Sequence, residues 1–219
     1  MITEEYRRWL EADLVDFDLK RELREISGDE EAIRERFAKS LEFGTAGLRG
    51  TLGAGTNRMN IWVVRQATQG VADWVKTQGG SQTVAISYDS RLKGWSFARD
   101  AASVLAANGI KVWIYEELMP VPALSFATRY YHCNAGIMLT ASHNPAQYNG
   151  YKAYGPDGCQ MTDDAAAVVY ASIQKTDVLN GAKYMSFSEG VEKGLIRFVS
   201  EDCKSAFYEA VESRQVRPG

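Results

Sequence analysis

Apolar residues recur at helical spacing in several segments of the chain, and glycine, proline or polar residues bound these segments. Near the N-terminus Trp9, Leu14 and Phe17 follow this period, and the Ser-Gly-Asp break at 27–29 divides the charged segment 20–36 into two helices. Helices are also predicted over residues 63–78, 96–107, 120–129, 162–174 and 203–211. The first forty residues are therefore expected to be helical.

Three short apolar runs between the later helices are predicted to be strands. They cover residues 83–88, 110–115 and 135–139. Alternation of strand and helix at this spacing is typical of a parallel sheet covered by helices. A glycine-proline turn at 155–158 predicts a short hairpin further on. We therefore expect an α/β fold: a three-layer domain with a mainly parallel mixed sheet between helices, preceded by an N-terminal helical extension.

The segment 43–55 contains five glycines in thirteen residues. This composition disfavours a helix, because each interior glycine costs about 1 kcal/mol relative to alanine. Glycine-rich loops let backbone N–H groups approach phosphate oxygens closely. The spacing matches neither the P-loop nor the dinucleotide-binding pattern. Taken alone, the segment is better interpreted as a loop of tight turns.

Polar residues capable of chemistry follow the strand 135–139 directly. The sequence Thr-Ala-Ser-His-Asn-Pro occupies 140–145, and Tyr-Asn-Gly-Tyr-Lys occupies 148–152. In open α/β sheets, ligands bind at the C-terminal ends of strands. A residue before proline is disfavoured in the helical region, so Asn144 and Pro145 favour a turn. Ser142 is therefore predicted to be displayed on a loop.

Two kinds of chemistry could use the Ser142 hydroxyl. A serine hydrolase needs a base and an acid that orients it, but His143 is adjacent in sequence and would point to the opposite face of a regular strand. There is also no Gly-x-Ser-x-Gly motif. A phosphorylated serine carries roughly −1.5 to −2 charges at neutral pH. Arg49, Lys152 and His143 could neutralise that charge, so phosphoryl transfer fits better.

The sequence Asp-Ser-Arg at 89–91 follows the predicted strand 83–88. It could help to build the same cleft as the Ser142 loop. It could equally form an internal ion pair with a cap. The sequence leaves both interpretations open.

Composition excludes several other classes of function. The 219 residues carry a net charge of −3 with acids and bases interspersed, whereas nucleic-acid binders usually show a basic face. No apolar run approaches the ~18 residues of a membrane helix, and the acidic N-terminus does not resemble a signal peptide. The three cysteines have no Cys-x-x-Cys spacing, which favours reduced thiols over a zinc site. We expect a cytoplasmic protein that binds neither nucleic acid nor membrane.

Together these motifs closely resemble the α-D-phosphohexomutase superfamily of phosphoglucomutase and phosphomannomutase enzymes. The matching segments, in order, are Phe-Gly-Thr-Ala-Gly-Leu-Arg-Gly at 43–50, Tyr-Asp-Ser-Arg at 88–91 and the two polar motifs at 140–145 and 148–152. The Ser142 motif is highly specific. The resemblance covers essentially the whole chain, as the first of the family's four domains.

The resemblance implies roles for particular residues. Ser142 resembles the active-site phosphoserine, which donates its phosphoryl group to a sugar phosphate and takes one back from a bisphosphate intermediate. His143 and Lys152 resemble the groups that handle the sugar hydroxyl proton and steady the phosphoryl group, and the sequence leaves open which is the general base. Arg49 resembles the arginine that reaches the same phosphate. Phosphate-binding positions are also implied at Thr45, Gly47, Asn144, Arg49 and Lys152.

The resemblance further implies a cofactor and missing domains. A phosphoryl oxygen on Ser142 would be one ligand of Mg²⁺, and glucose 1,6-bisphosphate would be the activator and intermediate. We expect a helical extension over 1–42, domain I over 43–198 and a truncated start of domain II over 199–219. The family's metal loop, sugar loop and phosphate clamp would lie in domains II to IV of the same polypeptide. A fragment without them is expected to lack mutase activity.

The resemblance leaves substrate and activity partly open. Thr140 and the helical extension resemble the longer phosphoglucomutase branch, which favours glucose phosphate as the hexose phosphate substrate. Phosphomannomutase and phosphopentomutase activities are alternatives. A non-catalytic phosphosugar-binding module is an alternative of another class, and it would have little need for Ser142.

Overall fold

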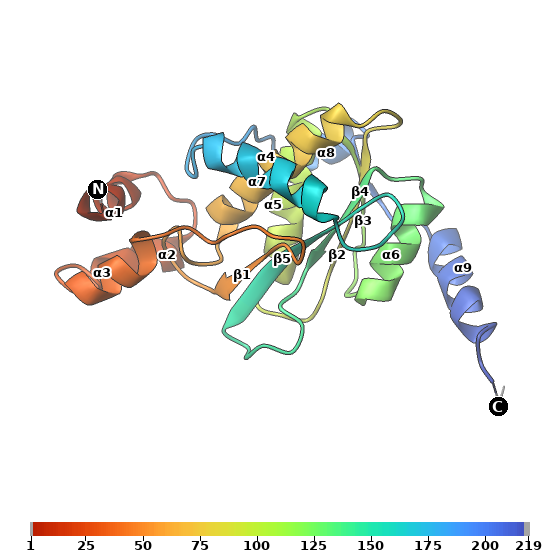
Figure 1. Cartoon of the computed structure of the whole chain (residues 1–219), viewed down its shortest axis with the longest axis horizontal. Coiled ribbons are helices and arrows are strands. Elements are labelled where there is room, and N and C mark those ends of the chain that lie inside the picture. The colour runs from red at the N-terminus through yellow and green to blue at the C-terminus, as the bar shows by residue number, and fades with distance from the viewer. Residues whose placement is uncertain (1, 217–219) are drawn as a thin grey trace.

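The computed structural model describes residues 2–216, in which six strands form one mixed sheet (Figure 1). The strands are β1 (Leu48–Thr51), β2 (Thr83–Tyr88), β3 (Lys111–Ile114), β4 (Ala135–Leu139), β5 (Tyr148–Tyr154) and β6 (Ile196–Phe198). Their order is β1-β5-β4-β2-β3-β6. The pairings of β2 with β3, β2 with β4 and β3 with β6 are parallel, whereas β5 is antiparallel to both β1 and β4. The sheet is thus mainly parallel and mixed, as expected.

Helices cover both faces of this sheet. On one face lie α4 (Ile61–Thr77), α5 (Gly94–Ala107), α7 (Asp163–Lys175) and α8 (Phe187–Glu192). On the other lie α6 (Val121–Tyr130) and α9 (Glu201–Glu212), which contact each other. Two apolar clusters fill the spaces between the layers. The three-layer α/β architecture expected from the sequence is confirmed.

The N-terminal segment forms the helices α1 (Ile2–Glu11), α2 (Phe17–Glu25) and α3 (Glu30–Phe37). They project from one end of the sheet in Figure 1. The fully buried indole of Trp9 contacts Phe37 and, on α4, Trp62. The Glu22 carboxylate accepts a 2.9 Å hydrogen bond from the backbone N–H of Ala54. These contacts join the N-terminal helices to both α4 and the glycine-rich segment.

Several elements were not predicted as such from the sequence. The glycine-rich segment contains the strand β1, and the motif at 148–152 lies on the strand β5. The short elements α8 and β6 also carry too few residues for a periodic signal. The predicted hairpin after Lys152 is reduced to a turn closed by one isolated bridge, Tyr154 with Gln160.

The three cysteines differ sharply in their surroundings. Cys133 and Cys203 are buried, whereas Cys159 is exposed. Burial raises the pKa of the Cys133 thiol to about 12, and it also raises the pKa of Cys203. The thiolate is the reactive form of cysteine. Both buried thiols are therefore expected to be unreactive in the folded protein at pH 8.

We expect iodoacetamide to label Cys159 alone in the native protein and all three cysteines in denaturant. Peptide mass spectrometry of labelled samples measures this directly. As a control, Cys159→Ser should take up no label while folded. Fast native labelling of Cys133 or Cys203 would contradict the packing of α6 and α9 described above.

Candidate active site

Ser142 lies in a tight turn that begins where β4 ends. Its backbone φ is +56°, in the left-handed region, a conformation that costs a non-glycine residue roughly 1–3 kcal/mol. The Ser142 N–H donates a 2.9 Å hydrogen bond to the Thr140 hydroxyl, which in turn donates to the Asp89 carboxylate. The Ser142 residue itself is exposed. The turn thus exposes the Ser142 hydroxyl, while hydrogen bonds fix the backbone of the same residue.

Arg91 supports the other side of this turn. Its Nη2 donates to the carbonyl oxygens of Ser142, at 2.7 Å, and Asn144, at 2.5 Å. Its Nη1 donates to those of Pro145, at 3.0 Å, and Tyr148, at 2.8 Å. The Arg91 side chain is only 12% exposed. One guanidinium therefore binds four backbone carbonyls of the segment that carries Ser142.

The Asp-Ser-Arg motif at 89–91 forms an internal ion pair with a cap and also contacts the Ser142 turn. Asp89 and Arg91 form an ion pair at 3.8 Å, and the Asp89 carboxylate also accepts from the backbone N–H of Arg91 at 3.1 Å. The same two side chains reach the Ser142 turn. The motif itself could be found in the sequence. The carbonyls that Arg91 binds could not be predicted, because every residue type has a backbone carbonyl.

His143 follows Ser142 in the turn and is exposed. Its Nδ1 lies 3.5 Å from the Ser142 hydroxyl oxygen, at the limit of a hydrogen bond. The two side chains can approach because the backbone is not a regular strand here, so the alternation argument made from the sequence does not apply. Within residues 2–216, however, no carboxylate orients the His143 ring. A serine-histidine-acid relay is therefore not assembled by these residues.

The glycine-rich loop reaches the Ser142 turn through Arg49. Gly44 and Gly47 exchange two backbone hydrogen bonds, of 3.0 and 2.7 Å, and close a tight turn that contains Thr45. The strand β1 begins at the next residue and pairs with β5. Arg49 Nη1 donates a 2.8 Å hydrogen bond to Asn144 Oδ1. Residues 95 positions apart in sequence are thereby joined at the same edge of the site.

Lys152 lies on β5, and its side chain is half-buried. Arg49 pairs with Gly150 across the β1–β5 ladder. Because Gly150 and Lys152 are two residues apart, Lys152 lies on the same face of the sheet as Arg49. The structure therefore brings Arg49, Asn144 and the Ser142 turn into contact, and it places Lys152 on the face that Arg49 occupies.

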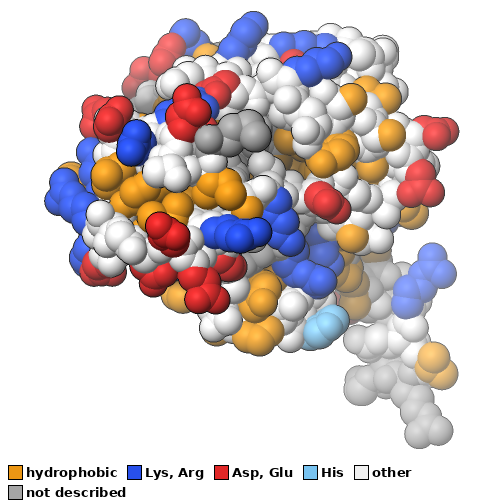
Figure 2. All heavy atoms as spheres, turned by 60° about the vertical axis from the view of Figure 1, so that its left-hand side comes forward, with side chains coloured by type: hydrophobic (Ala, Val, Ile, Leu, Met, Phe, Trp, Pro, Cys, Tyr) orange, Lys and Arg blue, Asp and Glu red, His pale blue; other side chains and the backbone are white. Residues whose placement is uncertain are grey.

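Metal ligands do not gather anywhere in the described part of the chain: residues 2–216 contain no group of three or more His, Cys, Asp or Glu side chains placed to hold a metal ion. In the same range, no helix is long and apolar enough to cross a membrane. Figure 2 shows basic and acidic side chains interspersed on one face of the protein. No extended surface of one charge is visible on that face.

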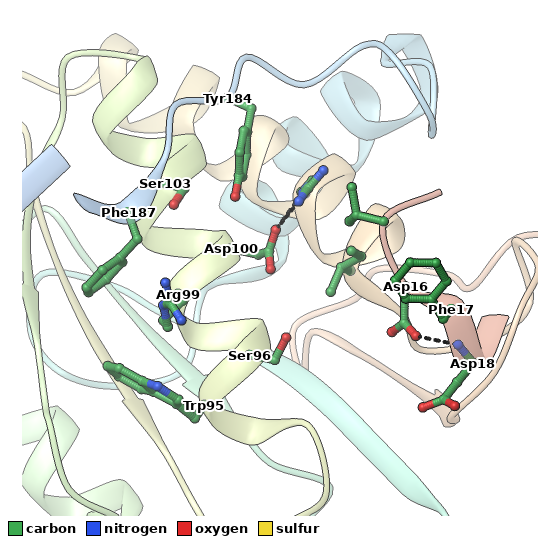
Figure 3. Close-up of a pocket in the computed structure, with 13 residues that line it drawn as sticks. Asp16, Phe17, Asp18, Trp95, Ser96, Arg99, Asp100, Ser103, Tyr184 and Phe187 are labelled. Carbon is green, nitrogen blue, oxygen red and sulfur yellow. Dashed lines mark hydrogen bonds and ion pairs between the residues drawn. The ribbon is translucent and has the colours of Figure 1, made fainter. Parts of the chain in front are cut away.

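A cavity of about 540 Å³ lies apart from the Ser142 turn. It is lined by residues of α2, α4, α5 and α8 and by the segments that precede α2 and α8. Figure 3 shows Asp100 and Ser103 on α5 opposite Asp16 and Phe17. An ion pair of 2.5 Å between Arg65 and Asp100 lies within it. Burial raises the pKa of Asp100, and the nearby Arg65 opposes this effect. None of the predicted site residues lines this cavity.

Comparison with known proteins identifies related chains. A family model described as phosphoglucomutase/phosphomannomutase, alpha/beta/alpha domain I, matches residues 40–179. The chain is 36% identical over 184 residues to a phosphoglucomutase of Staphylococcus saprophyticus, which covers 84% of this chain and 33% of that protein. It is 42% identical over 142 residues to a phosphoglucomutase of Staphylococcus aureus strain USA300, covering 65% of this chain and 26% of that protein.

The chain thus spans a third or less of the length of these two relatives. A crystal structure of a phosphoglucomutase/phosphomannomutase family protein from Burkholderia thailandensis superposes with a TM-score of 0.61 at 24% identity. The superposition covers 80% of this chain and 36% of that one. At this level of identity the likeness concerns the fold.

Proposed function

Because this chain belongs to the phosphoglucomutase/phosphomannomutase family through its α/β/α domain I, we propose that it carries the phosphoserine of a phosphohexomutase. The enzyme would interconvert hexose 1-phosphate and hexose 6-phosphate, with glucose as the favoured sugar. One observation carries this proposal: Ser142 is exposed on a turn where its own backbone is left-handed. Arg49 contacts the same turn through its hydrogen bond to Asn144.

In the proposed reaction, the phosphoryl group leaves the Ser142 oxygen and joins a free hydroxyl of the sugar phosphate. The P–O bond to serine breaks, a P–O bond to the sugar forms, and the hydroxyl proton passes to a base. Transfer of the other phosphoryl group from the bisphosphate back to Ser142 restores the phosphoenzyme. Such transfer depends mainly on positioning and charge neutralisation.

We assign the proton transfer to His143 or Lys152 and the neutralisation of phosphoryl charge to Arg49. His143 is 3.5 Å from the Ser142 oxygen. Arg49 is exposed beside the same turn and makes a hydrogen bond there to an amide, Asn144, without an ion pair among the described residues. Its charge is therefore available to a phosphoryl group. Thr45 and Gly47, in the adjoining turn, are further proposed phosphate-binding positions.

Magnesium fits this chain only in part. A phosphoryl oxygen on Ser142 would supply one hard oxygen ligand, of the type that Mg²⁺ prefers. The described residues offer no acidic cluster to complete its coordination. We propose that further domains of the same polypeptide hold its remaining ligands and the groups that recognise the sugar.

The proposal is tested by incubating the full-length polypeptide, including the proposed further domains, with glucose 1,6-bisphosphate and Mg²⁺ and then mapping phosphate by peptide mass spectrometry. The expected result is one phosphoryl group, on Ser142. Binding of the bisphosphate without transfer would support a phosphosugar-binding module instead. Labelling of Ser142 by a fluorophosphonate would support a hydrolase. Parallel incubations with mannose 1,6-bisphosphate and ribose 1,5-bisphosphate compare the alternative sugars.

A further inference from the structure

We infer that Arg91, together with Asp89, is a positioning residue that holds Ser142 in the conformation required for phosphoryl transfer. This inference rests on the function proposed above, and it concerns two residues to which that proposal gives no task. Arg91 would not touch the substrate. It would act through the backbone of the turn that carries Ser142.

The first observation is the set of acceptors around Arg91. Its guanidinium donates to four carbonyl oxygens, those of Ser142, Asn144, Pro145 and Tyr148. These carbonyls run from Ser142, within the connection between β4 and β5, to Tyr148, the first residue of β5. A planar guanidinium offers five donors in a fixed fork, which a lysine ammonium cannot reproduce. One side chain therefore fastens the connection beside Ser142 and at its β5 end.

The second observation concerns the backbone N–H of Ser142. The Thr140 hydroxyl donates to Asp89, so its oxygen is left to accept from the Ser142 N–H. Asp89 in turn accepts from the Arg91 backbone and pairs with the Arg91 side chain. The N–H of Ser142 is thus held through Asp89, and its carbonyl is held by Arg91.

The backbone strain at Ser142 explains why two supports are needed. A serine at φ +56° is in a sparsely populated region, and such a conformation persists only when its surroundings determine it. Without Arg91, the turn could relax to a conformation that aims the hydroxyl elsewhere. Phosphoryl transfer is sensitive to such changes, because a misplacement of about 1 Å can cost roughly 100-fold in rate.

The test compares Arg91→Met and Arg91→Lys with a matched control, Arg58→Met. The Arg58 side chain is 13% exposed, against 12% for Arg91, and it pairs with Glu35 away from the Ser142 turn. Two measurements are made on each variant. One is hydrogen exchange of the Ser142 and Asn144 amides by NMR. The other is the rate of Ser142 phosphorylation across a range of glucose 1,6-bisphosphate concentrations.

We expect Arg91→Met to speed exchange of the Ser142 amide by roughly tenfold or more, since hydrogen bonds to a charged group are lost. Its maximal rate of Ser142 phosphorylation should fall about 100-fold, with little change in the half-saturating bisphosphate concentration. For Arg91→Lys, the exchange rate of the Ser142 amide and the maximal rate of phosphorylation should both lie between those of Arg91→Met and the unaltered protein. Arg58→Met should change neither measurement at the turn.

Unchanged exchange at Ser142 in a folded Arg91→Met protein would overturn the inference. So would equal effects in Arg91→Met and Arg58→Met, because they would indicate a general loss of stability. If Arg91→Met does not fold, Arg91→Lys provides the same comparison. If the unaltered full-length polypeptide takes no phosphate at all, the proposed function fails, while the exchange measurement still decides whether Arg91 holds the turn.

Discussion

Replacing Ser142 with alanine in the full-length polypeptide is expected to abolish phosphate transfer from glucose 1,6-bisphosphate completely, because the replacement removes the oxygen that accepts the phosphoryl group. The fold should be unaffected. Ser142 is exposed, and the hydrogen bonds of its turn use its backbone N–H and carbonyl, which alanine retains. The measurement is phosphate incorporation by intact mass, with circular dichroism to verify the fold.

Two further variants sharpen this expectation. Ser142→Gly also removes the hydroxyl, but glycine adopts the left-handed region readily, so loss of transfer there could not be blamed on backbone strain. Ser90→Ala is the matched control, since Ser90 is another exposed serine at the end of β2, in the neighbouring loop. Ser90→Ala should retain full incorporation. Phosphate that persists in Ser142→Ala would place the acceptor elsewhere and refute the assignment.

The helical and parallel parts of this fold could be predicted from the sequence because their apolar residues are periodic or continuous. The helix α4 carries a buried stripe that includes Val64, Ala67, Val71 and Val75. The strand β4 is buried along its entire length, as expected of a strand covered on both faces. In such segments the local pattern and the tertiary environment agree, so residue spacing is sufficient evidence.

The antiparallel edge of the sheet could not be predicted in this way. The strand β1 has four residues, one of them a glycine, and it is specified by its pairing with β5 across about a hundred intervening residues. The strand β5 contains Asn149 and Gly150, which are poor strand formers. Asn149 is nonetheless fully buried, and its amide donates to the Leu92 carbonyl. Pairing partners far away in sequence override local propensity here.

The candidate site shows the same division between what residue types reveal and what geometry reveals. The motif around Ser142 could be located from sequence because its residues are chemically distinctive. The contact between Arg49 and Asn144 depends on the β1–β5 pairing, and the acceptors of Arg91 are backbone carbonyls that any residue would provide. Neither the Arg49–Asn144 contact nor the Arg91 hydrogen bonds can be predicted from the residue types alone. The contact between Arg49 and the Ser142 turn is thus made by strand pairing at the edge of the sheet.

Replacing Gly47 with alanine is expected to destabilise the protein by about 2–4 kcal/mol, the sum of a left-handed backbone conformation and a steric overlap. Gly47 has a φ of +78°, and an added Cβ would overlap the carbonyl oxygen of Tyr151 and lie 2.8 Å from the Lys152 Cα. Both neighbours belong to the backbone of β5, so they cannot move aside as a flexible side chain could. Urea denaturation followed by circular dichroism measures the loss.

Gly44 supplies the matched control for this change. It closes the same turn, exchanging backbone hydrogen bonds with Gly47, but an added Cβ there meets nothing within 4 Å. Gly44→Ala should therefore alter the free energy of unfolding by no more than about 0.5 kcal/mol. Because β1 begins directly after Gly47, Gly47→Ala should also displace Arg49 and weaken transfer to Ser142. Equal stability of the two variants would show that the glycine loop does not lie against β5, and the proposed placement of Arg49 beside the phosphoserine would lose its structural basis.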